Sequence, residues 1–451
     1  MRVGWCVPWL LVAGCGRLGF DPFSAAGGSG DRRDGDPGAD TGGTSDGTVD
    51  APGDSGIGRG SVQSISSGGA HTCAVLDGGR VRCWGRNAQG QLGYGHTQAI
   101  GDSEPASAGG DVAIGGTTLA VETGEDHSCV LLDTREVRCW GSGNVGRTGH
   151  GNQVDIGDDE PPSSVAVVAV GAMVNQLAAG AAHTCALLVT GAVRCWGTGA
   201  AGRLGYGNTT SIGDTEPPSA AGDVMVGATV TQIVAGDQHT CALTTVGTVR
   251  CWGDASLGQL GYGDTVDIGD TEPPSAAGDV TLGGTAVALA SGRNHVCALM
   301  TGGAVRCWGN NASGQLGYGN TTAIGDTEDP SSAGTVNIGG SAIAIAAGGN
   351  HTCALLSGGG VRCWGAADNG QLGYGNELVI GDGELPATAG TVMLTAGALR
   401  LSLGGAHSCA VVVGDHVQCW GAGGDGQQGH GNSADIGDTE TPNVAGVVPL
   451  E

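Results

Sequence analysis

Short apolar stretches alternate with glycine-rich turns from residue 61 onward, and the stretches recur in a constant order. Residues 68–70 and 77–79 are the first two of these turns, and such a turn between two apolar stretches is typical of a β-hairpin. A long segment with little strand pattern precedes the next apolar stretch. The first four stretches are 61–66, 71–76, 80–84 and 111–114. The pattern therefore predicts four short β-strands in each recurrence and no helix.

This order occurs seven times at a constant spacing of 56 residues, without an insertion. The units begin at residues 61, 117, 173, 229, 285, 341 and 397. A sequence repeat of this kind indicates a solenoid, a propeller or an array. Four short strands in each unit favour an all-β fold, a seven-bladed β-propeller that spans residues 61–451. A parallel β-helix is the alternative, but its coils are shorter, and a tight hairpin in every unit argues against it.

The turn between the last strand of one unit and the first strand of the next is very short, as at residues 283–285. We therefore expect these two strands to pair, so that a blade combines the last strand of one unit with the first three strands of the next. Under this scheme Val444–Val448 is left without a partner at the end of the seventh unit. Its pairing with Val62–Ser66 would close the ring and remove two exposed sheet edges.

Each unit places two cysteines ten residues apart on the two sides of its central hairpin. The pair Cys73 and Cys83 is centred on Gly78, and the same register sets Val75 opposite Val81. Directly opposed residues have Cβ atoms about 4.5–5.5 Å apart, which is close to disulfide reach. The predicted bridges are Cys73–Cys83, Cys129–Cys139, Cys185–Cys195, Cys241–Cys251, Cys297–Cys307, Cys353–Cys363 and Cys409–Cys419. On the chain-entropy model each short ring stabilises the fold by at most ~3 kcal/mol.

A metal site is the chemical alternative for the same residues. His71 and Cys73 share one face of a strand, and with Cys83 they would supply three ligands of the zinc type. A closed zinc site needs a fourth ligand, and none recurs at a suitable spacing. Disulfides are therefore favoured, and the repeated His is interpreted as a structural residue. Paired cysteines throughout the repeats also indicate an oxidising compartment.

Composition narrows the class of protein further. Glycine accounts for 92 of the 451 residues, which disfavours helices, and it does not recur at every third position as in collagen. All 18 basic residues are Arg, and the formal net charge is −26. Because a nucleic-acid-binding protein needs a basic surface, we expect no nucleic-acid partner. The absence of Lys also excludes chemistry that depends on a Schiff-base or phosphate-binding Lys.

The first 60 residues lack the repeat. Residues 1–14 carry one charge, at Arg2, and a short apolar stretch that is typical of a secretory signal. The run Val12–Cys15 resembles the lipobox of bacterial lipoproteins, which implies that Cys15 is the lipidated first residue of the mature protein. An ordinary signal peptide and a soluble N-terminus are the alternatives. Residues 15–60 are rich in Gly, Asp, Ser and Thr, which predicts a disordered linker.

This N-terminal sequence predicts where the protein resides. A lipidated Cys15 places it in the bacterial cell envelope, facing the periplasm or the exterior. The lipid would be the only contact with the membrane.

The repeat resembles a known family. The motif reads G-x-x-H-T-C-A-L, then G-x-V-R-C-W-G, then G-Q-L-G-Y-G, and its best copies lie in Gly292–Gly319 and Gly348–Gly375. This motif resembles the regulator of chromosome condensation repeat, and the resemblance covers all seven units. It implies a seven-bladed propeller in which His295, Trp308 with its following Gly, and Gly314–Gly317, together with their equivalents, maintain the fold.

The resemblance also implies guanine-nucleotide exchange on a small GTPase and binding to chromatin, as in the member that gives the family its name. We do not carry this activity over, because that member uses a protruding wedge and no insertion interrupts the 56-residue period here. The second and seventh units also depart from Gly-Gln-Leu-Gly, at Gly146–Gly149 and Gly426–Gly429. Exchange-factor activity and an envelope hydrolase are kept as alternative functions.

Two stretches vary most between units, and both are expected at the same rim of the propeller. One is the tetrad after each Trp-Gly, and the other is the residue pair before each repeated His. Variable loops on a repeated scaffold are a natural recognition surface, although repeats also diverge without a function. The candidate binding residues are Arg86, Asn87, Glu125, Asp126, Asp237, Asp254, Arg293, Asn310 and Asp368. We expect them to bind a protein or a glycan, with the chain as a monomer.

The acidic Ile-Gly-Asp-x-Glu segments are a second candidate. Their carboxylates, with glycine carbonyls and nearby Asn and Thr oxygens, could hold Ca²⁺, and the alternative is a solvated acidic loop. The residues concerned are Asp102, Glu104, Asp214, Glu216, Asp270, Glu272, Asp326 and Glu328. We expect no other cofactor. Equivalent carboxylate pairs in every unit do not make one active site, so no catalytic residue is assigned and a non-enzymatic binding or scaffold protein is predicted.

Overall fold

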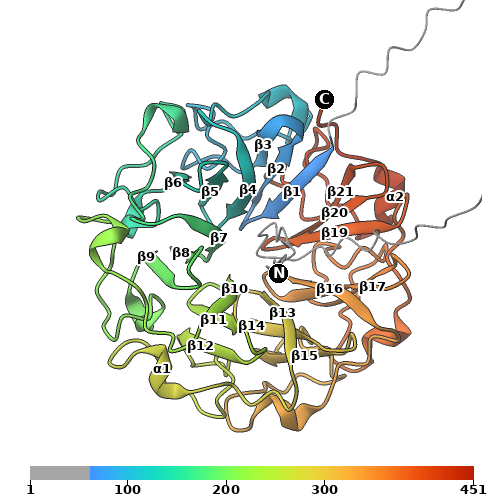
Figure 1. Cartoon of the computed structure of the whole chain (residues 1–451). Helices are drawn as coiled ribbons and strands as arrows, with labels where there is room; N and C mark the ends of the chain where they lie inside the picture. Colours follow the sequence, from blue (N-terminus) through green and yellow to red (C-terminus); the bar gives the residue numbers. More distant parts are fainter. Residues whose placement is uncertain (1–60) are drawn as a thin grey trace, which may run out of the picture.

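The computed structural model describes residues 61–451, which form seven three-stranded antiparallel sheets around a common centre (Figure 1). The first sheet consists of β1 (Val62–Ser67), β2 (His71–Leu76) and β3 (Arg80–Gly85), from the centre outward. The predicted all-β class with seven blades is confirmed, but each sheet has three strands and not the predicted four. The predicted signal at 1–14, the lipidation site Cys15 and the linker at 15–60 lie outside the described residues.

The other six sheets repeat the order of the first. Their inner strands are β4 (Thr118–Thr123), β7 (Val174–Ala179), β10 (Val230–Ala235), β13 (Ala286–Ser291), β16 (Ala342–Ala347) and β19 (Ala398–Leu403). Their middle strands are β5 (His127–Leu132), β8 (His183–Leu188), β11 (His239–Thr244), β14 (His295–Met300), β17 (His351–Leu356) and β20 (His407–Val412). Their outer strands are β6 (Val137–Gly141), β9 (Val193–Gly197), β12 (Val249–Gly253), β15 (Val305–Gly309), β18 (Val361–Gly365) and β21 (His416–Gly421).

Each unit also contains a one-turn helical segment, so the prediction of no helix is wrong. A Pro begins each segment or directly precedes it, and Pro fixes φ near the helical value. The segments are η2 (Ala106–Gly109), η4 (Pro162–Ser164), η6 (Pro218–Ala220), α1 (Pro274–Ala277), η7 (Pro330–Ala333), η8 (Pro386–Thr388) and α2 (Pro442–Ala445). Three further turns of this kind, η1 (Asp77–Gly79), η3 (Asn144–Gly146) and η5 (Ala200–Gly202), lie in loops. Within residues 61–451, no helix has the length and apolar character needed to cross a bilayer.

The central hairpin of each unit has the register that the cysteine spacing predicts. In the first blade Cys73 of β2 lies opposite Cys83 of β3, and Val75 lies opposite Val81. All seven predicted disulfides are formed, with the paired Cα atoms 4.0–4.1 Å apart. These fourteen sulfur atoms are therefore bonded to one another, which leaves no thiolate for the zinc alternative.

The last extended segment of each unit lies along a different strand from the one expected. The amide of Val112 donates to the carbonyl of Val81 in β3 of its own unit (2.8 Å), instead of pairing with β4 of the next unit. At the end of the chain, Val448 donates in the same way to Val417 of β21 (2.8 Å). The predicted pairing of Val444–Val448 with Val62–Ser66 is therefore wrong. The outer strand has a free edge that this segment covers, and the short glycine turn serves to lead the chain back toward the centre.

The apolar core lies between adjacent blades and is built around one buried Trp per blade. Trp140 of the second blade packs with Leu92 and Val112 of the first, and its side chain is fully buried. Its indole N–H donates to the backbone carbonyl of Gln91 in the first unit (2.9 Å). The same bond, from Trp to the preceding unit, is made by Trp84, Trp196, Trp308, Trp364 and Trp420.

The repeated His residues link each blade to the next. His71 Nε2 lies 2.9 Å from the Ser128 hydroxyl in the second blade, and that hydroxyl donates to the Gln91 carbonyl (2.9 Å). Since the hydroxyl proton is used there, His71 must donate from a neutral Nε2–H. The equivalent bonds are His127–Thr184, His183–Thr240, His295–Thr352, His351–Ser408 and His407–Thr72. In the fifth unit Val296 replaces the hydroxyl residue, and His239 instead bonds Ser291 (3.0 Å).

The joint between the seventh and first blades carries the same bonds as the other joints. Besides His407–Thr72, the Ser107 amide donates to the Pro449 carbonyl (3.0 Å), and every unit makes the equivalent bond. The other six are Ser163–Ala113, Ser219–Ala169, Ser275–Met225, Ser331–Thr281, Ala387–Asn337 and Asn443–Met393. Figure 1 shows the first and last sheets side by side. Each blade is therefore attached to its neighbour near the channel, through the buried Trp, and near the outer edge.

The buried His residues predict how stability depends on pH. Burial lowers the pKa of His71 and His239 to about 3, and it lowers the pKa of His127 and His183 well below the usual value. Below pH 6.5 the unfolded chain binds protons at these positions, whereas the folded chain binds them only near pH 3. The free energy of unfolding, measured by denaturant titration, should therefore fall as the pH drops from 6.5 toward 3.

A single substitution separates the contribution of the buried His residues from that of the carboxyl groups. Burial raises the pKa of Asp237 to about 6, so that residue acts in the opposite direction. Replacing His71→Gln removes one titrating group and should make the pH dependence shallower. A stability profile that is flat across this pH range in the unsubstituted protein would contradict the assignment of the His residues as buried neutral donors.

Candidate binding site at the channel mouth

The inner ends of all seven blades surround a small cavity on the central axis, with a volume of about 60 Å³. It is lined by the ends of the inner strands and by the turns that follow them, including the first residue of each pair before a repeated His. Most of the lining residues are Gly, Ala, Ser or Thr. Glu125, Asp237 and Arg293 are the charged residues among them. The charged residues at the mouth of the channel therefore come from three of the seven blades.

The geometry of the turn explains why these side chains reach the axis. The turn begins with a Gly whose amide donates to the carbonyl of the repeated His, as in Gly68 to His71 (2.8 Å). A Cβ on Gly68 would lie 2.8 Å from Cε1 of the His71 ring, so only Gly fits there. The next residue donates its amide to the turn of the following blade, as in Gly69 to Gly124 (3.1 Å). The side chain of this second residue has no part in the joint and is presented to the mouth.

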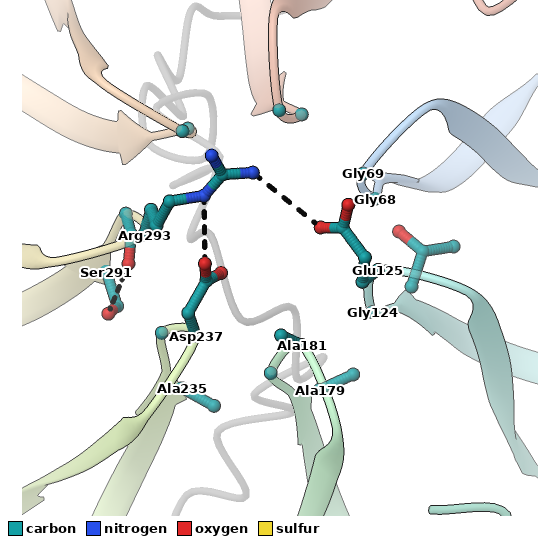
Figure 2. A pocket seen from close by; sticks show the side chains of 18 of the residues that line it. Gly68, Gly69, Gly124, Glu125, Ala179, Ala181, Ala235, Asp237, Ser291 and Arg293 are labelled. Atoms are coloured by element: carbon teal, nitrogen blue, oxygen red, sulfur yellow. Dashed lines mark hydrogen bonds and ion pairs between the residues drawn. The ribbon is translucent and has the colours of Figure 1, made fainter. Parts of the chain in front are cut away.

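Figure 2 shows Arg293 extending across the mouth toward Glu125. Its Nε lies 2.8 Å from Oδ2 of Asp237, and its Nη2 lies 3.9 Å from Oε2 of Glu125. The three residues come from the second, fourth and fifth blades, and their side chains are partly exposed. Burial raises the pKa of Asp237 to about 6, and Arg293 opposes this shift by favouring the charged carboxylate.

Two Arg residues behind the mouth replace the Gln of Gly-Gln-Leu-Gly. In the first unit Gln91 Oε1 accepts from the Gln89 amide (2.9 Å). Arg has no acceptor, so Arg203 donates its Nε to the Ala200 carbonyl (2.9 Å) and reaches the Asp237 carbonyl with Nη1 (3.2 Å). Arg147 contacts the Ala181 carbonyl in the same way (3.3 Å). Sequence reasoning noted the departure at Arg147 but did not connect it to the mouth.

The exchange of Gln for Arg also changes the backbone. The residue two positions before the Gln presents an N–H to it, whereas the loop must present a carbonyl to the Arg. Val145 and Ala201 occupy this position before Arg147 and Arg203, and each has φ of 55°, in the left-handed region. That region costs a residue other than Gly roughly 1–2 kcal/mol. Backbone strain therefore lies beside the charged part of the mouth.

The other candidate rim residues lie outside the cavity. Arg86 and Asp126 lie near each other beside the mouth, with Nη1 and Oδ1 3.9 Å apart. Asp254 accepts bonds within its own loop, from Ser256 and Gln259. Asn310 accepts from the Ala312 amide, and Asp368 is exposed; neither lines the cavity.

Asn87 is a structural residue, so its prediction as part of a binding surface is wrong. Its side chain is 1% exposed. The amide group donates to the carbonyls of His96 (2.6 Å) and Gln98 (2.9 Å) and accepts from the Leu92 amide (2.9 Å). Asn offers both donors and an acceptor, which suits it to closing this loop.

The acidic segments lie at the joints between blades, away from the mouth. Gly157 of the second unit packs against Gly90 of the first, where a Cβ would lie 2.4 Å from the Gly90 carbonyl oxygen. Within the calcium candidates, the residue between the two acids bonds the Glu, as Thr271 does to Glu272 (2.6 Å). The same bond is made to Glu104, Glu216 and Glu328. In residues 61–451, three acidic groups come within 4.8 Å of one another only at Asp158, Asp159 and Glu160, outside these four pairs.

Seven antiparallel sheets around an axial cavity define the class as a β-propeller. Two sequence profiles described as "Regulator of chromosome condensation (RCC1) repeat" match the chain. One matches residues 62–91, 119–147, 174–203, 230–259, 286–315 and 342–371, and the other matches 190–243 and 302–355. The chain belongs to the RCC1 repeat family.

Its relatives carry diverse names. The chain is 32% identical to the ultraviolet-B receptor UVR8 of Arabidopsis thaliana over 83% of its own length and 80% of the receptor. It is 29% identical to a secretion-regulating guanine nucleotide exchange factor of Bos taurus, over 70% of the chain and 69% of that protein. The human E3 ubiquitin-protein ligase HERC2 is 33% identical, but the match spans only 5% of that protein.

Solved structures share the fold. Human WBSCR16 superposes with a TM-score of 0.62 at 19% identity, covering 80% of this chain and 93% of the other. Yeast RCC1 (Prp20), solved with Kap60, gives a TM-score of 0.58 at 20% identity, covering 76% of this chain and 78% of the other.

The strained loop yields a prediction about stability. Replacing Ala201→Gly should raise the free energy of unfolding by about 1 kcal/mol, because Gly adopts a positive φ without the steric cost of a Cβ. Ala200→Gly, at the neighbouring exposed position with helical geometry, should lower the free energy of unfolding by up to about 1 kcal/mol. Denaturant titration of both variants measures the difference. Equal effects of the two substitutions would show that Ala201 is not strained.

Proposed function

We propose that the protein is a non-enzymatic binding or scaffold protein of the bacterial cell envelope that receives a protein partner at the channel mouth. The observation that carries this proposal is the convergence of Glu125, Asp237 and Arg293 from three blades. Other blades place Gly or Ala at the same position, such as Gly69, Ala181 and Gly349. Charged residues at one place in an otherwise near-uniform scaffold are typical of a recognition surface.

The site does not favour an enzyme. Catalysis needs a cleft in which an acid, a base or a nucleophile meets a bound substrate. The cavity of about 60 Å³ is far smaller than the ~300–1,000 Å³ typical of small-molecule sites. The two carboxylates at the mouth share an Arg and are not placed against a nucleophile. A shallow charged mouth of this kind is suited to binding a protein surface, which requires no catalytic group.

The names of the relatives do not assign an activity to this chain. They include a light receptor, an exchange factor and ubiquitin-protein ligases, which shows that one repeat scaffold accompanies unrelated functions. The distant solved structures support the fold alone. The function therefore has to be argued from the mouth itself.

Capture of partners from native cell-envelope extract tests the proposed site. The variant Glu125→Gln, Asp237→Asn, Arg293→Gln keeps the turns but removes the charges. The amount of partner that it captures should be lower by about tenfold or more. The matched control removes two acids and one base from the opposite rim, as Asp133→Asn, Glu136→Gln, Arg135→Gln, and should retain capture. Equal capture by the two variants would refute a binding site at the mouth.

We also propose that the protein is exported and lipidated at Cys15. Seven disulfides within the repeats support an oxidising compartment, and the run Val12–Cys15 supports a lipoprotein signal. Mass spectrometry of the mature N-terminus should find an acylated Cys15, and Cys15→Ala should abolish the acylation. A cytosolic protein that begins at Met1 would refute export.

A further inference from the structure

We propose that the channel mouth is a receptor for one guanidinium or ammonium group of the partner, and that Arg293 occupies this receptor in the free protein. The inference rests on the proposed function and specifies the chemistry of the bound group. In the structure, a guanidinium already lies between carboxylates from two other blades, Asp237 and Glu125 (Figure 2). The site is therefore built to hold this kind of cation.

The size of the cavity limits the bound group to a single side-chain head. A volume of about 60 Å³ is far below the ~300–1,000 Å³ of sites that enclose a small molecule. A sugar ring, a nucleotide or a folded loop does not fit into this space. The head of an Arg or Lys side chain does, while the rest of the partner rests on the surrounding turns.

The charges at the mouth select a cation over an anion. Among the charged side chains that line the cavity, the carboxylates of Glu125 and Asp237 outnumber the guanidinium of Arg293. Asp126 lies in the turn beside Glu125, and its Oδ1 is 3.9 Å from Nη1 of Arg86. Arg147 and Arg203 lie behind the mouth, where they donate to backbone carbonyls, and the charge of Arg203 favours the ionised form of Asp237. The formal charge of −26 adds a long-range field that attracts cations and repels anions.

The contacts of Arg293 indicate that its side chain can be exchanged. Its Nε lies 2.8 Å from Asp237, but its Nη2 is 3.9 Å from Glu125, which is longer than a direct hydrogen bond, and its side chain is 41% exposed. The backbone of Arg293 is fixed independently, because its amide donates to the carbonyls of Gly348 and Gly349 (both 3.1 Å). The side chain can therefore leave without disturbing the turn, and an incoming cation would take its place between the two carboxylates.

Chemical rescue of an Arg293→Ala variant tests the proposal. The third blade already carries Ala181 at the same position, so the turn accommodates this residue. The probe is methylguanidinium, titrated at about pH 8 so that Asp237 is ionised, with binding measured by calorimetry. Arg293→Ala should bind methylguanidinium at least about tenfold more tightly than the unsubstituted protein, in which Arg293 competes.

Three controls make the result decisive. Methylurea, a neutral analogue of the same shape, should not bind. Adding Glu125→Gln and Asp237→Asn to Arg293→Ala should abolish the binding of methylguanidinium. Equal affinity of the variant and the unsubstituted protein, or equal binding of methylurea, would overturn the proposal. Binding of Ca²⁺ in preference to methylguanidinium would also overturn it, because the mouth would then be a metal site.

The capture experiment distinguishes this failure from a failure of the proposed function. If partner capture depends on the charged mouth but methylguanidinium does not bind Arg293→Ala, the cation receptor is wrong and the binding face is retained. If methylguanidinium binds but capture is unaffected by removing the charges, the proposed partner site is wrong. In the second case the mouth binds a cation for another purpose.

Discussion

The backbone carbonyl in the middle of each Gly-Gln-Leu-Gly segment is the acceptor on which the joints between blades depend. The carbonyl of Gln91 receives both the indole N–H of Trp140 and the hydroxyl of Ser128 from the next blade. Ser128 in turn accepts from His71, so that two side chains of one blade and two groups of the other meet at one point. A neutral hydrogen bond contributes about 1 kcal/mol, but leaving any of these buried groups unpaired would cost more. The His, the Thr or Ser, the Trp and the glycines of the repeat are thus required together.

The same joint explains why so much of the sequence is Gly. A Cβ on Gly93 would lie 2.8 Å from the indole nitrogen of Trp140, and Gly85, with φ of 106°, has the Ala70 carbonyl 2.5 Å from its ideal Cβ position. Blades packed this closely leave little freedom at the joint. The second residue of the inner turn contributes only its backbone, since Gly69, Asp237 and Gly405 all donate their amides to the next turn. Side chains can therefore vary there without weakening the ring of blades.

The sequence was sufficient to predict the repeated local structure. The constant spacing predicts seven units, and the ten-residue step between Cys73 and Cys83 predicts a hairpin whose register the structure contains. Contacts that depend on how units curve around the axis could not be predicted in the same way. The segment at Val112 has two strand edges within reach, and its sequence does not distinguish β3 from β4. Likewise, a variable rim could be predicted, but Asn87 and Glu125 look equally available in the sequence, although one closes a buried loop and the other lines the mouth.

A scaffold with equivalent blades acquires a unique site only by breaking its symmetry, and the structure shows how the break is arranged. Glu125, Asp237 and Arg293 change the charge of the mouth at positions that the joint leaves unconstrained.

Arg147 and Arg203 also change the joint itself. In their loops an Arg side chain, which only donates hydrogen bonds, replaces the Gln side chain that accepts one. The Arg147 carbonyl still accepts the bonds from Trp196 and Thr184 of the next blade. The Arg203 carbonyl accepts from Thr240, but within residues 61–451 the buried indole N–H of Trp252 has no hydrogen-bond partner. The replacement instead strains the backbone at Val145 and Ala201, which adopt positive φ. Strain of this kind persists when the surrounding structure holds it in place. The strained loops belong to the second and third units. The Arg side chains of these units donate to the turns of the third and fourth blades. The asymmetry thus lies in the second to fifth units, and it gives the mouth the single orientation that the proposed receptor needs.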